Sequence, residues 1–286
     1  MQREIESRRN ELGREIPVPT ERSVGPSGRE RVTRELPGRN GQAYRISTDA
    51  LKTLAEIGRF RAIHIPDLIQ HRYAGNHDGI TDLKDLLRQG LIAWKSVAID
   101  PKEAAVSAVF LTKAGKQLAE SNPLRAGIVP GQQLWSQFVK PREIRHDAAL
   151  YRLFQAERGA IERGGGTVTN VVLDYQIKQR LFPERERARR TMTPEQFKNY
   201  LPDLAEAHGL KMICDTMPIP DLRIEYSAAN GEQEKVDLEL ATKNYHCSHL
   251  KDHAEAGFKT YAIAEDHAAL SKVWDAHDIT GSILSL

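Results

Sequence analysis

Hydrophobic residues follow two different periods along the chain, and helical spacing dominates the first part. Between residues 48 and 120, apolar positions recur at intervals of three and four, interrupted by two short β-like runs. The predicted elements are helices at 48–58, 65–71 and 78–89, strands at 91–99 and 105–111, and a closing helix that begins at Thr112. Thr48 or Asp49 can cap the first helix, and Gly58 can end it.

From about residue 141 onward, helical and strand-like segments follow one another. The first four are a helix at 142–163, a strand at 167–174, an irregular basic section at 178–190 and a helix at 193–208. Strict alternation of polar and apolar residues then predicts strands at 220–226 and 235–242, which the turn at 227–233 can join into a hairpin. A helix at 245–257, a strand at 259–264, a helix at 266–276 and a strand at 278–284 complete the series.

These patterns predict a mixed α/β (α+β) protein, and its 286 residues are about twice the usual size of a domain. We expect one domain at 46–125, a linker at 126–140 and a second domain at 141–286. Residues 1–45 contain few large apolar side chains and many prolines and glycines, so we expect a largely disordered arm there.

Composition excludes two broad classes. No segment approaches the roughly 20 apolar residues that a membrane-spanning helix requires, and the first residues lack the apolar core of a signal peptide. We therefore expect a cytoplasmic protein with no membrane contact. Two cysteines, Cys214 and Cys247, cannot make a disulfide framework.

The net charge of +2 conceals an uneven distribution. Residues 1–45 contain 10 arginines and 7 glutamates, a balance of +3, and the rest of the chain carries −1. The arm could follow nucleic-acid phosphates or serve as a charged linker. A second basic cluster lies in the C-terminal part and consists of Lys178, Arg180, Arg185, Arg187, Arg189 and Arg190. We expect this cluster to hold a DNA backbone.

The order of elements in 46–125 resembles the winged-helix fold, specifically in Leu86–Ile92, where the third helix passes directly into a strand, and in Phe110–Gly115. The resemblance implies that the third helix enters the major groove and that the hairpin tip touches the DNA backbone. The cations expected to contact DNA in this region are Lys84, Arg88, Lys95 and Lys102. The same helix carries Asp78, Asp82 and Asp85, which would oppose phosphates, so a protein-binding or dimerisation role stays open.

Three acidic residues point to chemistry in the second domain. Asp221 opens one predicted strand, while Asp237 and Glu239 share a face of the next, and the register could place all three together. The pair Pro220-Asp221 and the run Asp237-Leu-Glu239, within residues 140–286, resemble the PD-(D/E)XK or restriction-endonuclease-like family. That resemblance implies Mg²⁺ bound by Asp221, Asp237 and Glu239, hydrolysis of a DNA phosphodiester, and a lysine that orients the attacking water.

The sequence departs from this family at the lysine. If Asp237 is the acid of the second strand, Glu239 stands where the family has its lysine, an Asp-x-Glu variation that some members of the fold use. If Glu239 is the acid, Ala241 takes the position of the lysine, and Lys243 lies four residues from Glu239, about 13 Å along the strand. Lys251 on the following helix could replace it, and Lys235 less readily. Three further residues could approach the site, namely Asp147, Glu157 and Gln176.

The complete arrangement also resembles the replication-relaxation family of plasmids and integrative elements. The residues that carry this resemblance are Arg145-His-Asp147, the Pro-Asp pair, and Asp237–Thr242 followed by a lysine-bearing helix and a tyrosine. It implies DNA transactions of a mobile element, and a role in a defence system is the other setting that we expect for such a nuclease.

Two other functions remain open. A catalytically silent nuclease-like domain would make the protein a winged-helix regulator of transcription or plasmid replication, and a purely structural protein would assemble with a homodimer partner or another protein. The residues His246, Cys247, His249 and His253 could bind zinc, although no distant residue completes that set.

Overall fold

The computed structural model describes residues 33–38, 41–74, 77–98, 105–137, 143–242, 245–276 and 283–286. All of them belong to one compact unit, Arg31–Leu286. Most of the predicted arm, together with Lys102 and Lys243, lies outside the described residues.

The N-terminal region, residues 33–137, begins with a hairpin that the sequence analysis assigned to the arm. Strands β1 (Thr33–Pro37) and β2 (Ala43–Ser47) pair antiparallel. The hairpin forms because Leu36, Tyr44 and Ile46 alternate with polar residues and become buried. Ser47, rather than Thr48 or Asp49, caps the next helix by accepting a hydrogen bond from the Ala50 amide at 3.0 Å.

The remaining elements of this region are α1 (Thr48–Arg59), β3 (Ile63–His64), α2 (Ile65–Tyr73), α3 (His77–Arg88), β4 (Ile92–Val97), β5 (Val106–Leu111), α4 (Lys113–Glu120) and α5 (Pro123–Ala126). They include the predicted elements in the predicted order, together with a short strand, β3, and a short helix, α5, that were not predicted. The three strands form an antiparallel sheet in the order β3-β5-β4. Thr112 caps α4 as expected, because its hydroxyl accepts a hydrogen bond from the Gly115 amide at 3.1 Å.

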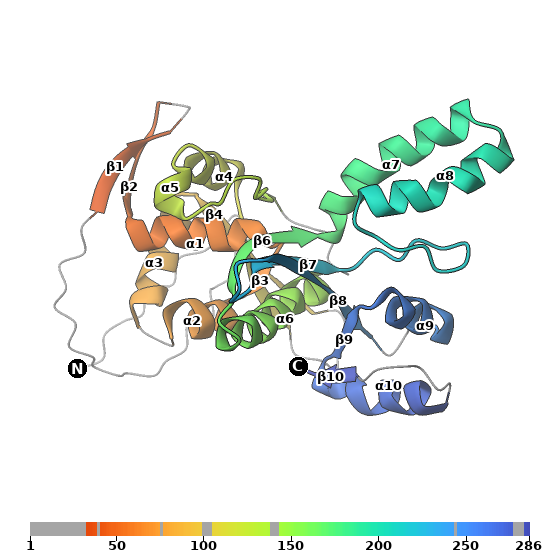
Figure 1. Ribbon diagram of the computed structural model, residues 1–286. Coiled ribbons are helices and arrows are strands. Elements are labelled where there is room, and N and C mark those ends of the chain that lie inside the picture. The colour runs from red at the N-terminus through yellow and green to blue at the C-terminus, as the bar shows by residue number, and fades with distance from the viewer. Residues whose placement is uncertain are drawn as a thin grey trace. The chain divides into compact units, whose positions relative to one another are not determined.

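The C-terminal region, residues 143–286, is built on a five-stranded mixed sheet (Figure 1). Its elements are α6 (Ile144–Arg163), β6 (Thr167–Leu173), α7 (Asp174–Thr191), α8 (Pro194–Ala207), β7 (Leu222–Ser227), β8 (Gln233–Ala241), α9 (Cys247–Ala256), β9 (Lys259–Ala262), α10 (Ala264–Ala276) and β10 (Ile283–Ser285). The strand order is β10-β9-β8-β7-β6, with antiparallel pairing from β6 to β8 and parallel pairing from β8 to β10.

Strand alternation assigns the two faces of this sheet. Leu240 in β8 and its register partner Tyr261 in β9 face α6, because the Tyr261 hydroxyl donates to Glu157 of that helix. On the opposite face, Ala241 and Ala262 pack with α9 and α10, while Val172 packs with α7 and α8. Asp237 and Glu239 belong to this second face.

One prediction for this region was wrong. Residues 178–190 are not irregular but form most of α7, although Pro183 lies inside that helix. The helix continues because Ile177, Leu181 and Ala188 are buried along one side, while Pro183 is solvent-exposed, where a missing amide hydrogen bond costs less. Figure 1 shows α7 and α8 as a helical hairpin that extends beyond the sheet.

The segment predicted as a linker packs against the second region. The side chain of Gln132 bonds both backbone groups of Val171, donating to its carbonyl at 2.9 Å and accepting from its amide at 3.1 Å. Because β6 is an edge strand, the side-chain amide of Gln132 occupies hydrogen-bonding positions that a neighbouring strand would use. Ala62, Ala108 and Ile144 add a small apolar cluster between the two regions.

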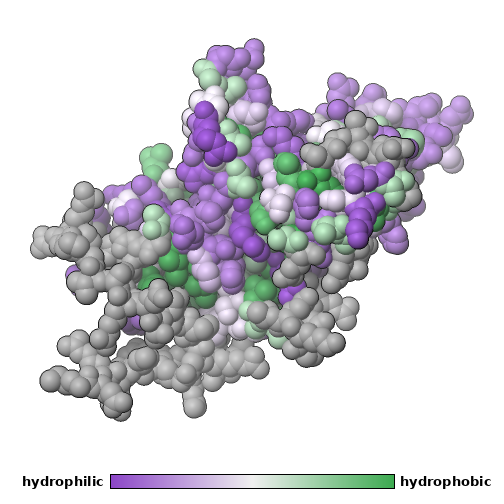
Figure 2. Space-filling model, turned by 90° about the horizontal axis from the view of Figure 1, so that it is seen from below, coloured by the Kyte–Doolittle hydropathy of each residue, from purple (hydrophilic) through white to green (hydrophobic). Residues whose placement is uncertain are grey.

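Hydrophilic residues predominate on the face shown in Figure 2, and its hydrophobic residues form several small areas. Within the described residues, no helix combines the length and apolar character needed to cross a membrane.

A close contact between α4 and the start of β4 gives a test of the N-terminal packing. A Cβ atom on Gly115 would lie 1.9 Å from the carbonyl oxygen of Leu91. We therefore expect Gly115→Ala to lower the free energy of unfolding by about 2 kcal/mol or more in urea titrations followed by circular dichroism. Gly159→Ala in α6 is the control, since its Cβ would meet only the flexible end of Arg163 at 3.3 Å, and it should gain up to about 1 kcal/mol. Equal effects of the two changes would contradict this packing.

Candidate active site

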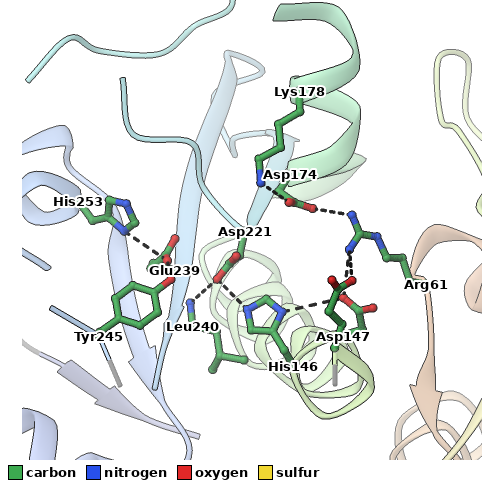
Figure 3. A network of polar contacts seen from close by, with 11 residues as sticks. Arg61, His146, Asp147, Asp174, Lys178, Asp221, Glu239, Leu240, Tyr245 and His253 are labelled. Carbon is green, nitrogen blue, oxygen red and sulfur yellow. Dashed lines mark hydrogen bonds and ion pairs between the residues drawn. The ribbon is translucent and has the colours of Figure 1, made fainter. Parts of the chain in front are cut away.

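The candidate site lies where β7 and β8 meet the start of α6 (Figure 3). Asp221 immediately precedes β7, Glu239 lies within β8, and His146 belongs to the first turn of α6. The backbone carbonyl of Asp221 accepts a hydrogen bond from the Asp174 amide at 3.1 Å, which fixes the entry to β7 beside the end of β6. Figure 3 shows the side chains of Asp221, Glu239 and His146 turned toward one region.

The Asp221 carboxylate is held by two partners. Its Oδ2 atom lies 3.1 Å from His146 Nε2 and accepts a hydrogen bond from the Leu240 amide at 3.0 Å. Burial raises the pKa of Asp221, but the charge of His146 and these hydrogen bonds lower it. Their combined effect is larger than that of burial, so the pKa of Asp221 is below the ordinary value. Burial lowers the pKa of His146, yet Asp221 and Asp147 raise it well above the ordinary histidine value. The pair is therefore an aspartate and an imidazolium at neutral pH.

Glu239 is a buried carboxyl group with one unused oxygen. The residue is 1% exposed, the Tyr245 hydroxyl donates to Oε1, and His253 Nδ1 lies 3.3 Å from the same atom. Among the described residues, Oε2 has no hydrogen-bond partner, and neither does the hydroxyl of Thr260, the register partner of Glu239 on β9. Burial and the nearby charge of Asp221 raise the pKa of Glu239, and His253 and Tyr245 offset this only in part.

Asp237, the third predicted metal ligand, is bound to an arginine instead. Arg223, its register partner on β7, donates from Nε to Oδ1 at 2.6 Å and from Nη2 to Oδ2 at 2.9 Å. The same guanidinium donates to the carbonyls of His208 and Gly209, at 3.0 and 2.8 Å, so it joins β7 and β8 to the end of α8. Across the described residues, no group of three or more acidic, histidine or cysteine side chains is arranged to hold a metal ion. The expected convergence of three carboxylates does not occur.

The candidate lysines are not placed beside these carboxylates. The Lys251 side chain is 63% exposed and its nearest acid is Glu255, at 3.9 Å. Lys235 donates to the Gly209 carbonyl at 2.5 Å, and Ala241, two residues after Glu239, is completely buried. Lys243 is outside the described residues.

The additional residues named from the sequence have structural partners. Glu157 accepts hydrogen bonds from Lys259 and Tyr261, at 2.5 and 2.8 Å. Gln176 accepts from the Leu173 amide at 2.9 Å and caps α7. Asp147 is 2% exposed, lies 3.6 Å from Arg61 and retains one buried oxygen without a hydrogen-bond partner.

A cavity of about 700 Å³ adjoins His146 and is lined by residues of both regions. Arg61, from the N-terminal region, lines it and lies beside the rings of Tyr175 and Trp135, at 4.9 and 5.6 Å from their centres, while the two rings contact each other edge to face at 4.8 Å. Its guanidinium lies 3.1 Å from Asp174, which Lys178 also contacts at 2.6 Å. Burial raises the pKa of Tyr175 to about 12, so this phenol is neutral and can stack on the cation.

The arginines of the predicted basic cluster on α7 fall into two groups, those that pair with an acid of the same helix and those that do not. Arg189 and Arg190 bond to Glu186, and these contacts lower the pKa of that glutamate to about 2. Arg180, Arg185 and Arg187 are exposed, and none of their side chains has an ion pair or hydrogen bond within the described part of the chain.

The acids of α3 differ in exposure and in their partners. Asp82 is 3% exposed and accepts a hydrogen bond from the Tyr73 hydroxyl at 3.1 Å. Asp85 pairs with Arg88, whereas Lys84 is exposed and has no ion pair with any described residue. Lys95 is half-buried on β4. The side chain of Asp78 is outside the described set.

Sequence reasoning missed roles for His146, Arg61 and Tyr245. The run Arg145-His-Asp147 was recognised as a motif, but nothing in it revealed that His146 meets Asp221, 75 positions later. The proposed zinc residues are not assembled either: the His249 and His253 rings stack with centres 6.5 Å apart, and His253 instead approaches Glu239.

Comparison with protein-family models found no match, and comparison with curated proteins found no significant similarity.

Neutralising Glu239 and neutralising Asp237, two residues apart on β8, should change the free energy of unfolding in opposite directions. Glu239→Gln removes a charge that Asp221 repels, so we expect the free energy of unfolding at neutral pH to rise by about 1 kcal/mol. Asp237→Asn leaves a buried arginine without its carboxylate and should cost about 3 kcal/mol.

Urea titrations of both variants provide the measurement. The gain from Glu239→Gln should start to shrink as the pH falls through the raised pKa of Glu239, and it should vanish below the ordinary pKa of a glutamate in the unfolded chain, because the wild-type carboxyl group is then neutral in both states. A loss of stability in both variants at neutral pH would refute the repulsion between Glu239 and Asp221.

Proposed function

We propose that the protein binds DNA through a winged-helix domain and hydrolyses phosphodiester bonds in a restriction-endonuclease-like domain with Mg²⁺. The resemblance to the replication-relaxation family extends this proposal to DNA transactions of a mobile element.

The winged-helix assignment is supported by the sequence of elements from α1 to β5 and by the sheet order β3-β5-β4. In such a domain α3 would enter the major groove. Lys84 is exposed there, and the ion pair that restrains Arg88 is an exposed one, worth under about 1 kcal/mol, so a phosphate can compete for that arginine. With Asp82 turned inward, the exposed side of α3 can accept a polyanion.

The nuclease-like assignment is supported by the order α6, β6, β7, β8, α9 and β9 in a sheet where β8 pairs antiparallel with β7 and parallel with β9. Asp221 at the start of β7 and Glu239 in β8 occupy the two acidic positions of that family. The observation that carries the catalytic proposal is the unpartnered, buried Oε2 of Glu239 beside a second carboxylate. Repulsion between buried acids costs stability, and a bound cation would offset it.

The side chains fit a cation held by two carboxylates. Mg²⁺ often uses only one or two protein carboxylates and completes its shell with water and phosphate oxygens. Asp221 and Glu239 would hold it, whereas Asp237, engaged by Arg223, would not. When bound, the ion would polarise the phosphate and lower the pKa of a bound water.

The chain itself orients the two carboxylates. The Leu240 amide and His146 fix the plane of the Asp221 carboxylate, and the Tyr245 hydroxyl fixes one oxygen of Glu239 while leaving the other unused. These contacts would preorganise the site before the substrate arrives.

A second candidate is a catalytically silent DNA-binding regulator, and one observation favours it. Ala241 is buried at the position where the family has its lysine, and Lys251 points toward solvent. This candidate predicts sequence-specific duplex binding that does not depend on metal.

Nicking of supercoiled plasmid tests the catalytic proposal. Asp221→Asn and Glu239→Gln should each reduce Mg²⁺-dependent nicking by about a hundredfold or more while retaining DNA affinity, because each loses a cation ligand. Glu234→Gln, an exposed residue of the same strand, is the control and should remain active. Unchanged nicking in both site variants would overturn the assignment, and a wild-type protein that binds DNA but never nicks it would favour the silent regulator.

Duplex binding at different salt concentrations tests the role of α3. Lys84→Gln should weaken binding and reduce the slope of log affinity against log salt by about 0.9, the value for one lost phosphate contact. Lys272→Gln, an exposed lysine on α10, makes the same change in net charge and should leave the slope unchanged. Identical slopes for the two variants would exclude α3 from the DNA interface.

A further inference from the structure

One side of α7 carries a row of cationic and aromatic side chains. At 3.6 residues per turn, Lys178, Phe182, Arg185 and Arg189 recur at intervals of four, three and four, so they occupy one flank of the helix. The buried side contains Ile177, Leu181 and Ala188, and the exposed Arg180 and Arg187 lie on the opposite flank. The row is about 16 Å long at 1.5 Å per residue.

The row begins at the candidate active site. Lys178 and Phe182 line the cavity of about 700 Å³, which His146 also lines, and His146 holds the Asp221 carboxylate. Three acids line this cavity as well, namely Glu143, Asp147 and Asp174. Arg61 lies within 3.7 Å of each of them and Lys178 contacts Asp174, so most of the negative charge that a phosphate would meet there is compensated. A chain lying along the row would therefore lead from the tip of the α7–α8 hairpin toward Asp221.

Phe182 is exposed where a helix surface ordinarily carries a polar residue. The residue is 46% exposed, and it is the one aromatic among the large hydrophobic residues that the described chain leaves exposed. The cationic Lys178 precedes it by one turn, and Arg185, which has no ion pair with a described residue, follows it by one turn.

An aromatic ring between cations matches the chemistry of single-stranded DNA. A single strand offers phosphates together with free base faces that stack on aromatic rings, whereas a duplex keeps its base faces within its own stack. Duplex DNA could use the arginines but would gain nothing from the exposed ring.

We propose that this flank of α7 binds a single-stranded segment of DNA, with a base stacked on Phe182 and phosphates beside Lys178 and Arg185. The inference rests on the proposed function, and it names the substrate class as DNA with an unpaired strand next to the cleavage point.

Fluorescence anisotropy of a labelled oligodeoxythymidylate, titrated with the full-length protein in EDTA, measures this binding without cleavage. Phe182→Ala and Phe182→Leu should both weaken binding by about tenfold, because leucine keeps the apolar bulk but lacks a flat ring, and Phe182→Trp should restore it. Arg185→Gln should weaken binding severalfold, and the matched Arg187→Gln on the other flank should have less than half that effect. Thermal unfolding confirms that each variant is folded.

The outcomes separate this inference from the function on which it rests. Unchanged oligonucleotide affinity in Phe182→Ala, or equal losses in Arg185→Gln and Arg187→Gln, would overturn the single-strand site even if Asp221→Asn abolishes nicking. Loss of oligonucleotide binding in Phe182→Ala, in a protein that nicks no DNA with any divalent metal, would support the single-strand site and refute the nuclease.

Discussion

The Asp221 carboxylate joins three parts of the C-terminal region through hydrogen bonds of about ordinary length. It precedes β7, accepts from the Leu240 amide of β8 at 3.0 Å and pairs with His146 of α6 at 3.1 Å. The Asp221 side chain is 16% exposed, and a carboxylate that has lost most of its hydration is tolerated only when such partners compensate the loss. The positions of α6, β7 and β8 at this edge are therefore set by the same contacts that orient a candidate ligand, and the site and the fold cannot vary independently.

Contacts of α6 also connect the candidate site to the N-terminal region. Asp147, the residue after His146, lies 3.6 Å from Arg61, whose guanidinium also contacts Asp174 at the start of α7. Arg61 also lies over two aromatic rings that contact each other, which replaces part of its hydration and favours a single orientation. Together with the Gln132 amide on the edge of β6, these contacts make the region between residues 126 and 137 part of the packed structure rather than a free tether.

Much of this architecture could be predicted because it follows from local pattern. Period-two alternation predicted β7, β8 and their turn, and helical periodicity predicted α1, α3, α6 and α8. The site was predicted less completely. Asp221 and Glu239 were identified from their positions, but the sequence did not show that Arg223 would face Asp237, since that depends on the register of two strands. His146 and Asp221 meet only through tertiary folding. The helix α7 was missed because Pro183 and dense positive charge indicate a break, and burial against α8 outweighed both.

Charge along a sequence also differs from charge available to a partner. In the basic cluster on α7, Lys178, Arg189 and Arg190 are engaged with acids of the same helix, so the unpaired charge is concentrated on Arg180, Arg185 and Arg187. In α3 the exposed surface is more positive than the sequence suggests, because the burial of Asp82 removes an acid from the exposed side. Ion pairing therefore reduces the positive charge that α7 can offer to an anionic partner, and the burial of Asp82 reduces the negative charge that α3 exposes to such a partner. The net charge of α7 is therefore not what distinguishes it from an ordinary charged surface. The distinguishing feature is the exposed ring of Phe182, because a phenyl ring has no charge that an acid of the same helix could neutralise.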